Sequence, residues 1–409
     1  YFITENAELQ DTTVEAMVQY WKESNEKHYT LFENDGFAWF KGGRNLVDNV
    51  STSTDKPRSI TIASPKLSSY AKGGTLAINV TANVASAYTI SINDSVVGKA
   101  NMSTANYDKA AASSKTYRIK GLKETNTITL TCNSGGPLRL DYAMLYVPEM
   151  ASEIDLNNMS FPAAEYVYNI TNQDHHADSN VDMVIIIPTS QKFLGQAERL
   201  KKFHEEHDGL TVNIVPADEL YNEFSSGTPD VSAYRRYMKM LYDRADSTKT
   251  EPKYLLLFGG CVWDNRLMTS DCRAYNADDL LLCYESESSY NEISCFVSDD
   301  FIGMLDDNEA IMTGTSSYLG TPDIGIGRFP VSSLEEAKTV VDKTIAYASN
   351  ANVGSWQNTI MFMGDDGNDN LHMRDVNIVA EDVISDYPGF NIRFAKRLKA
   401  LGIPVIYFI

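Results

Sequence analysis

Four aspartates lie close together in the stretch SCFVSDDFIGMLDDNEA, residues 294 to 310. They are Asp299, Asp300, Asp306 and Asp307, with the apolar run FIGML between the two pairs. Carboxylates this dense, with no adjacent Lys or Arg, repel one another unless a cation, water or backbone donors satisfy them. Calcium prefers such oxygen ligands. We therefore predict a structural calcium site on these four residues, and solvated turn acids are the alternative.

Two further chemistries are open to the acids and to one cysteine. Paired carboxylates near a strand end also serve as acid and base in glycoside hydrolysis, although the sequence does not choose the partners. Cys261 follows a glycine pair in GGCVWDN, where a sharp turn could present a thiol nucleophile. A buried small thiol is the alternative interpretation.

A second acidic turn, GDDGNDNLHM, carries Asp365, Asp366, Asp369 and His372. It has the acid density of a calcium loop but lacks the spacing and the terminal glutamate of an EF-hand. Acids at a helix N-terminus, placed favourably against the helix dipole, are the alternative interpretation.

The sequence does not indicate a catalytic or metal-binding role for the other histidines. His204 and His207 lie three residues apart in a predicted helix, a spacing that permits metal binding but also fits a solvated face. His175 and His176 fall in a polar segment that we predict to be a linker.

Composition excludes some classes of partner. The 409 residues carry a formal charge of −20, from 55 acidic residues against 35 lysines and arginines. Nucleic acid and anionic membrane surfaces attract clustered cations, so neither is an expected partner. No apolar run approaches the roughly 20 residues that span a bilayer. The chain starts at Tyr1 without a methionine or a signal peptide, so we expect it to begin after removed residues.

Five cysteines occur and none forms a C-x-x-C pair or a zinc spacing. They are Cys132, Cys261, Cys272, Cys283 and Cys295. In an oxidising compartment they could form one or two disulfides of undetermined connectivity, and buried thiols are equally compatible with the sequence.

The first 150 residues have the pattern of a β-sandwich. Short segments with a two-residue apolar period are separated by Gly, Asn and Ser, which is typical of an antiparallel jelly-roll-like sandwich. The predicted strands are 59–64, 75–84, 88–94, 116–122, 126–133 and 138–148. Residues 104–115 are predicted to be a loop. Trp21 and Trp39 are candidates either for a sugar platform or for the core.

After a linker at 151–180, strands alternate with helices, which predicts an α/β domain with a mainly parallel sheet. The expected strands are 181–188, 210–215, 253–260, 323–331 and 359–367. The expected helices are 191–209, 229–245, 333–350 and 371–387. Ser333 and Glu336 predict a capping box. We place a first α/β subdomain at 181–350 and the start of a second at 351–409, with ligands at the carboxyl ends of the strands.

Five blocks in order resemble the gingipain family of cysteine peptidases, closest to the sortase branch of the type IX secretion system in Bacteroidetes. They are LYNEFSSGTPDVSAYRRYMKMLYDRA, PKYLLLFGGCVWDNR, FVSDDFIGMLDD, PDIGIGRFPVSSLEEAKTVVDKTIAY and MGDDGNDNLHMRD. The similarity extends from Val181 to Arg393, and the preceding sandwich matches that branch. The resemblance implies a caspase-like fold in which a histidine-activated cysteine attacks a peptide carbonyl. It also implies structural calcium.

The chain departs from the family pattern at the catalytic motifs. No histidine follows His372 and no cysteine follows Cys295, whereas the family's His-Gly and Cys motifs lie downstream of the block that here ends near Arg393. Cys261 replaces a turn residue of the family's FGDGSYDNR motif and does not correspond to its nucleophile. We therefore assign no catalytic residue and expect this chain by itself to lack peptidase activity.

The resemblance implies a protein or peptide substrate and, in the sortase branch, secreted cargo and other secretion-system components as partners. It implies a secreted, periplasmic or outer-membrane-associated location in a Gram-negative bacterium. The alternative function is a non-catalytic surface or carbohydrate-binding protein that keeps the peptidase scaffold.

Overall fold

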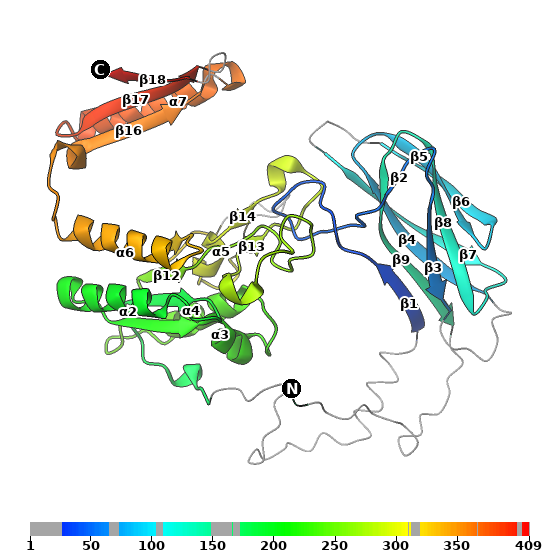
Figure 1. Ribbon diagram of the computed structural model, residues 1–409, viewed down its shortest axis with the longest axis horizontal. Coiled ribbons are helices and arrows are strands. Elements are labelled where there is room, and N and C mark those ends of the chain that lie inside the picture. The colour runs from blue at the N-terminus through cyan, green and yellow to red at the C-terminus, as the bar shows by residue number, and fades with distance from the viewer. Residues whose placement is uncertain are drawn as a thin grey trace. The chain divides into compact units, whose positions relative to one another are not determined.

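The computed structural model describes residues 27–64, 73–103, 109–148, 166, 172–309, 311, 320–365, 367–398 and 403–408. The chain divides into two compact units, Tyr1–Lys338 and Thr339–Ile409. The first unit contains the β-sandwich and a parallel α/β sheet, and the second contains a smaller sheet with one long helix (Figure 1). Trp21 and most of the predicted linker lie outside the described residues.

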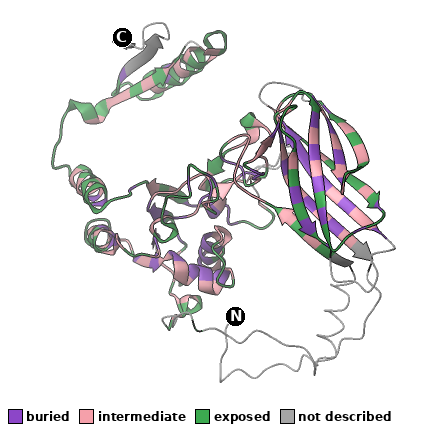
Figure 2. Cartoon of the chain, turned by 45° about the vertical axis from the view of Figure 1, so that its right-hand side comes forward, coloured by how far each residue is buried: buried purple, intermediate pink, exposed green. Residues whose placement is uncertain are grey.

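Two antiparallel sheets form the sandwich, as predicted. One sheet has the order β1 (Lys27–Glu33), β9 (Leu138–Pro148), β4 (Gly74–Ala82) and β7 (Ala111–Ile119), with β2 (Ser51–Thr52) paired to β9. The other has the order β3 (Arg58–Ala63), β8 (Thr125–Ser134), β5 (Ser86–Ile92) and β6 (Ser95–Met102). Buried and exposed residues alternate along these strands because successive side chains point to opposite faces (Figure 2).

The sequence prediction was incomplete in this domain. The predicted loop at 104–115 is wrong from Ala111 onward, because β7 begins there and pairs with β4 along its whole length. The hairpin strand β6 was missed, although Asn93 and Asp94 both have positive φ (47° and 66°) in the two-residue turn between β5 and β6. Asn and Asp tolerate this conformation, which matches the twist of paired strands.

The α/β part of the first unit has a four-stranded parallel sheet, as predicted. Its order is β11 (Val212–Pro216), β10 (Met183–Ile187), β12 (Tyr254–Phe258) and β15 (Gly325–Phe329). Every residue of β10 is buried, which explains its continuous run of apolar residues. The chain passes from β10 to β11 on one side and then returns past β10 to β12 on the other side. This reversal of direction creates a switch point at the carboxyl ends of the strands.

Three helices and several short segments accompany this sheet. They are α2 (Leu194–Phe203), α3 (Ala217–Phe224), α4 (Ser232–Asp243), the four-residue α5 (Asp300–Gly303), and the hairpin of β13 (Tyr284–Glu285) with β14 (Val297–Ser298). The helix α3 was missed by the sequence prediction, and its apolar face packs in the core through Leu220, Tyr221 and Phe224. The predicted helix at 191–209 ends in a π-helical turn, His204–Asp208, followed by Gly209 at φ 68°.

The helix α6 (Leu334–Ala348) begins with the predicted capping box. Glu336 accepts a hydrogen bond from the Ser333 backbone N–H at 3.1 Å, and the Ser333 hydroxyl accepts one from the Glu336 N–H at 3.2 Å. In the second unit, β16 (Thr359–Gly364) pairs in parallel with β17 (Asn391–Leu398). The strand β18 (Ile403–Phe408) pairs antiparallel with β17, and α7 (Gly367–Asp386) contacts β16.

Candidate functional site

A pocket of about 530 Å³ opens at the carboxyl ends of β10, β11 and β12. Its walls come from Thr189 after β10, Asp218 and Tyr221 on α3, Val262 after β12, and the segment 277–282. The full lining is Thr189, Asp218, Tyr221, Asn222, Gly227, Pro229, Val262, Asn265, Arg266, Leu267, Ala277, Asp278, Leu280, Leu281 and Leu282. Sequence analysis predicted ligands at these strand ends but named none of these residues.

The charged side chains that line the pocket are Asp218, Asp278 and Arg266, and the Arg266 guanidinium is ion-paired with Asp35 at 2.7 Å. The Oδ1 atom of Asp218 is buried and has no hydrogen-bond partner. Burial, aided by the charges of Glu219 and Asp278, raises the pKa of the Asp218 carboxyl. An unsatisfied carboxylate oxygen is costly, so Asp218 offers an acceptor to a hydrogen-bond donor entering the pocket.

Two buried tyrosines hold the pocket wall in place. The hydroxyl of Tyr221, a lining residue, contacts the hydroxyl of Tyr234 on α4, and the Tyr234 hydroxyl accepts a hydrogen bond from the Leu282 N–H at 3.4 Å. Tyr234 is fully buried. The part of the pocket wall that contains Leu282 is therefore held by a hydrogen bond to α4 as well as by its own loop.

Arg328 on β15 connects the loops that follow the strands. Its guanidinium donates to both carboxylate oxygens of Asp299, at 2.8 and 2.7 Å. It also donates to the carbonyl oxygens of Gly259 at 3.1 Å and Leu282 at 3.0 Å. With only 9% of the Arg328 side chain exposed, this is a largely buried, bidentate ion pair.

Three of the four aspartates predicted to bind calcium have separate side-chain partners. Asp299 pairs with Arg328, Asp307 pairs with Lys239 at 3.1 Å, and Asp306 accepts a hydrogen bond from Tyr242 at 3.1 Å. Asp300 begins α5, where its N–H donates to the Ser298 hydroxyl. Within the described ranges, no group of three or more His, Cys, Asp or Glu side chains could hold a metal ion. This conformation therefore does not provide a converged ligand set for calcium.

Calcium binding at this segment stays a prediction. Millimolar calcium is expected to raise the melting temperature of the chain, because a ligand that binds the native state stabilises it by mass action. The measurement is a thermal melt in calcium, in magnesium at equal ionic strength, and after chelation. No change on chelation would contradict a calcium site and assign the carboxylates to the contacts described above.

Cys261 lies directly after Gly259 and Gly260 at the end of β12 and is partly exposed. The thiol of the buried Cys283 lies 3.4 Å from the carbonyl oxygen of Val262, the residue that follows Cys261. Interaction with the Cys283 thiol, and the nearby Arg328 charge, outweigh burial and lower the pKa of Cys261 to about 6. None of the hydrogen bonds of the described residues joins Cys261 to a histidine, so the arrangement is not a cysteine–histidine dyad.

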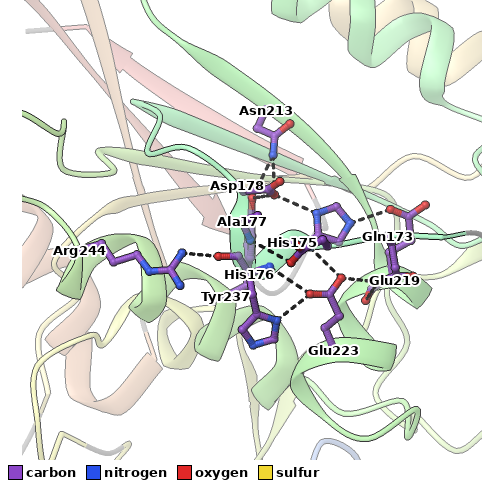
Figure 3. Close-up of polar contacts among 11 residues, drawn as sticks. Gln173, His175, His176, Ala177, Asp178, Asn213, Glu219, Glu223, Tyr237 and Arg244 are labelled. Carbon is purple, nitrogen blue, oxygen red and sulfur yellow. Dashed lines mark hydrogen bonds and ion pairs between the residues drawn. The ribbon is translucent and has the colours of Figure 1, made fainter. Parts of the chain in front are cut away.

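His175 and His176 form a polar cluster that sequence analysis missed (Figure 3). They lie in a short 3₁₀ helix, His175–Ala177, at the end of the predicted linker. The His175 ring bonds Asp178 through Nδ1 at 2.9 Å and Glu219 through Nε2 at 2.7 Å. Glu223 accepts from the backbone N–H groups of both histidines at 2.8 and 3.1 Å. The cluster therefore fastens the linker end to α3.

The charge of this cluster follows from its contacts. Burial lowers the pKa of His175, but the hydrogen bonds to Asp178 and Glu219 outweigh it, so the pKa is raised above its usual value. Asp178 also accepts hydrogen bonds from the Tyr237 hydroxyl at 2.8 Å and from the Asn213 amide at 3.2 Å. A protonated imidazole with two carboxylate partners is the state that these contacts favour.

The remaining residues singled out in the sequence have local roles. His204 and His207 both bond the carboxylate of Asp208, at 2.6 and 2.7 Å, at the end of α2. His372 contacts Asp365, whereas Asp366 lies outside the described residues. Trp39 donates to the Thr81 hydroxyl at 2.9 Å and packs edge-on against Phe37.

The fold and the pocket define a mixed α+β protein whose α/β sheet carries a site at the carboxyl ends of its strands. The model of peptidase family C25 matches residues 176–397, more than half of the chain. The chain belongs to peptidase family C25, and this confirms the resemblance to the gingipain family drawn from the sequence. The matched region contains the parallel sheet, the pocket and Cys261.

Among solved structures, the chain is similar to dimeric latent PorU from Porphyromonas gingivalis, with a TM-score of 0.68 and 21% identity. The match covers 81% of this chain and 39% of the PorU chain, so the chain spans well under half the length of that protein. This likeness confirms the mixed α+β fold. None of the curated proteins matches the chain.

Parts of the chain also align with carbohydrate-binding modules at low TM-scores. A family 35 module from an environmental isolate matches with a TM-score of 0.20 and 17% identity, covering 30% of this chain and 99% of the module. The CBM35 module of Cellvibrio japonicus Abf62 matches with a TM-score of 0.19 and 11% identity, covering 31% of this chain and 100% of the module. Such scores carry no argument about function. Within the described part of the chain, no helix is long and apolar enough to cross a membrane.

Proposed function

We propose that the chain is part of a gingipain-type cysteine peptidase with a sortase-like role in type IX secretion, cleaving a peptide bond and transferring the acyl group. In this proposal the described residues recognise the peptide and do not perform the chemistry, because no hydrogen bond among them joins Cys261 to a histidine. Its location would be the periplasm or the outer surface of a Gram-negative cell. Its partners would be secreted cargo and components of the secretion system.

The observation that carries the proposal is the pocket at the strand ends, which lies inside the region matched by the peptidase family. In open α/β sheets, ligands bind outside the carboxyl ends of the strands, next to a switch point. The pocket combines leucine side chains with the Asp218 carboxyl group, so it offers apolar contact and a hydrogen-bond acceptor to a peptide. The unpartnered Oδ1 of Asp218 would accept from a peptide N–H or a basic side chain.

Peptide binding to the purified chain tests this proposal. Fluorescently labelled peptides of varied sequence are expected to bind without being cleaved, and Asp218→Asn is expected to weaken the best binder about tenfold, because one charge-assisted hydrogen bond is lost. Fluorescence polarisation measures the affinity, and mass spectrometry of the same samples reports cleavage.

A matched control is Glu198→Gln, which removes one carboxylate from the exposed side of α2, outside the pocket. It should leave peptide affinity unchanged. Equal peptide affinity in wild type and Asp218→Asn would contradict recognition in this pocket, and peptide cleavage by the chain alone would contradict the division of roles. A melting temperature raised by oligosaccharides but not by peptides would favour the carbohydrate-binding alternative.

A further inference from the structure

Two cysteines lie on neighbouring segments at the edge of the pocket. Cys261 follows β12, and Cys283 lies one residue before β13. The Leu281 N–H donates to the Gly260 carbonyl at 2.9 Å, so the two segments run side by side. The Cys283 thiol lies 3.4 Å from the carbonyl oxygen of Val262, the residue next to Cys261, so the two thiols belong to directly adjacent stretches of backbone.

The surroundings of the two thiols differ. Cys261 is partly exposed, whereas only 1% of Cys283 is exposed. Arg328 anchors both segments through the carbonyl oxygens of Gly259 and Leu282, so its positive charge lies beside the thiols. A positive charge favours the thiolate, which is the reactive form. Interaction with Cys283 and the Arg328 charge lower the pKa of Cys261 against the effect of burial, whereas interaction with Cys261 and burial both raise the pKa of Cys283, in agreement with this asymmetry.

We propose that Cys261 and Cys283 form a redox-active dithiol that closes to a disulfide across the wall of the pocket. Cys261, the accessible member, is the attacking thiol, and Cys283, which is buried against it, is the resolving thiol. The oxidant is a disulfide, either a small molecule or a protein. Val262, Leu281 and Leu282 line the pocket, so the new bond joins two parts of its wall.

The exchange is balanced in two steps. The Cys261 thiolate attacks a disulfide RSSR, forming a mixed disulfide with R and releasing one thiolate RS⁻, which takes up the proton that Cys261 gave up. Cys283 then loses its proton and attacks Cys261 Sγ, forming the internal disulfide and releasing the second RSH. The protein loses two protons and two electrons, and RSSR is reduced to two RSH.

The other three cysteines have different surroundings. Cys132 lies in the sandwich, where its thiol donates to the Ser134 carbonyl oxygen. Cys295 donates to the Phe40 carbonyl oxygen at 3.3 Å. Cys272 is buried, with 2% of its surface exposed. None of these three contacts another thiol among the described residues. The pairing is therefore specific to Cys261 and Cys283, a choice that the sequence left open.

The test uses the 409-residue chain treated with oxidised glutathione or with dithiothreitol, then blocked with N-ethylmaleimide, digested and analysed by mass spectrometry. We expect a Cys261–Cys283 cross-linked peptide only in the oxidised sample, with Cys132, Cys272 and Cys295 alkylated after unfolding. The oxidised chain should melt higher by on the order of 5 °C, because the bond restricts the unfolded state.

Three variants separate the roles of the thiols. Cys283→Ser is expected to accumulate a stable glutathione adduct on Cys261, since the resolving thiol is missing. Cys261→Ser should leave Cys283 unmodified. The matched control Cys272→Ser removes a buried thiol from the same loop and should form the cross-link as the wild type does.

Several results would overturn the proposal. One is full alkylation of both thiols in the wild type after treatment with oxidised glutathione. A second is a disulfide that joins either thiol to Cys272 or Cys295. A third is glutathione on Cys283 in Cys261→Ser at the rate seen for Cys261. Because the wild-type measurements need no substitution, a variant that fails to fold does not prevent the test.

Discussion

Replacement of Arg328 by methionine is expected to lower the free energy of unfolding of the α/β part by about 3–5 kcal/mol, because a charged partner of a buried pair is left alone. The Asp299 carboxylate would lose both of its guanidinium hydrogen bonds. The carbonyl oxygens of Gly259 and Leu282 would lose their donor as well. Thermal melting should show the change as a fall on the order of 10 °C.

The matched control for this prediction is Arg44→Met. Arg44 pairs with Glu287 at 2.9 Å, but about half of each side chain is exposed (54% and 50%). Solvent screens such a pair, so its loss should cost less than about 1 kcal/mol. In the double variant Arg328→Met with Asp299→Asn, the cost should be smaller than the sum of the two single costs, since both act on one contact. Equal effects of Arg328→Met and Arg44→Met would contradict the role assigned to Arg328.

Replacement of His175 by glutamine is expected to lower the free energy of unfolding by about 1–3 kcal/mol at mildly acidic pH, because two partly buried carboxylates lose a charged donor. Only 13% of the His175 side chain is exposed, so solvent does not replace these bonds fully. Urea denaturation of wild type and variant at several pH values measures the difference. The exposed His207, which pairs with Asp208, supplies the control His207→Gln.

The pH dependence has a defined sign. The pKa of His175 is raised in the folded chain above its usual value of 6.5. The folded state therefore binds the proton more tightly than the unfolded state, and the stabilisation is fully present below about pH 6.5 and lost as the pH rises through the folded pKa. The difference between wild type and His175→Gln should shrink in alkaline buffer. A difference that grows with pH would contradict a protonated His175.

The regular strands of this protein were predictable from the local sequence. The alternation along β5 and β8 predicted two antiparallel sheets, and the apolar run of β10 predicted a buried parallel strand. Burial on one face or on both faces imposes these patterns directly on neighbouring residues. The capping box of Ser333 and Glu336 was predictable for the same reason, because its partners lie three residues apart.

The elements that the sequence did not predict are short or have an irregular pattern. The eight-residue α3 is apolar on one face over only two turns, too short for a clear helical period. β6 has an irregular burial pattern at the sheet edge, and its best signal was the Asn93–Asp94 turn. Because the segment around His175 was predicted to be a linker, the contacts of this histidine were not predicted. Polar composition does not indicate which carboxylates of a later helix a side chain will contact.

The sequence by itself determined the two kinds of sheet, their order along the chain and the family, because these follow from patterns among neighbouring residues and from ordered motifs. Only the tertiary structure decided that Asp299 pairs with Arg328, 29 residues away, and does not share a ligand set with the neighbouring acids. It likewise placed the segment of Cys261 beside that of Cys283, and His175 within hydrogen-bond distance of Glu219. Contacts of this kind depend on how strands and loops meet in space, and no local period records them.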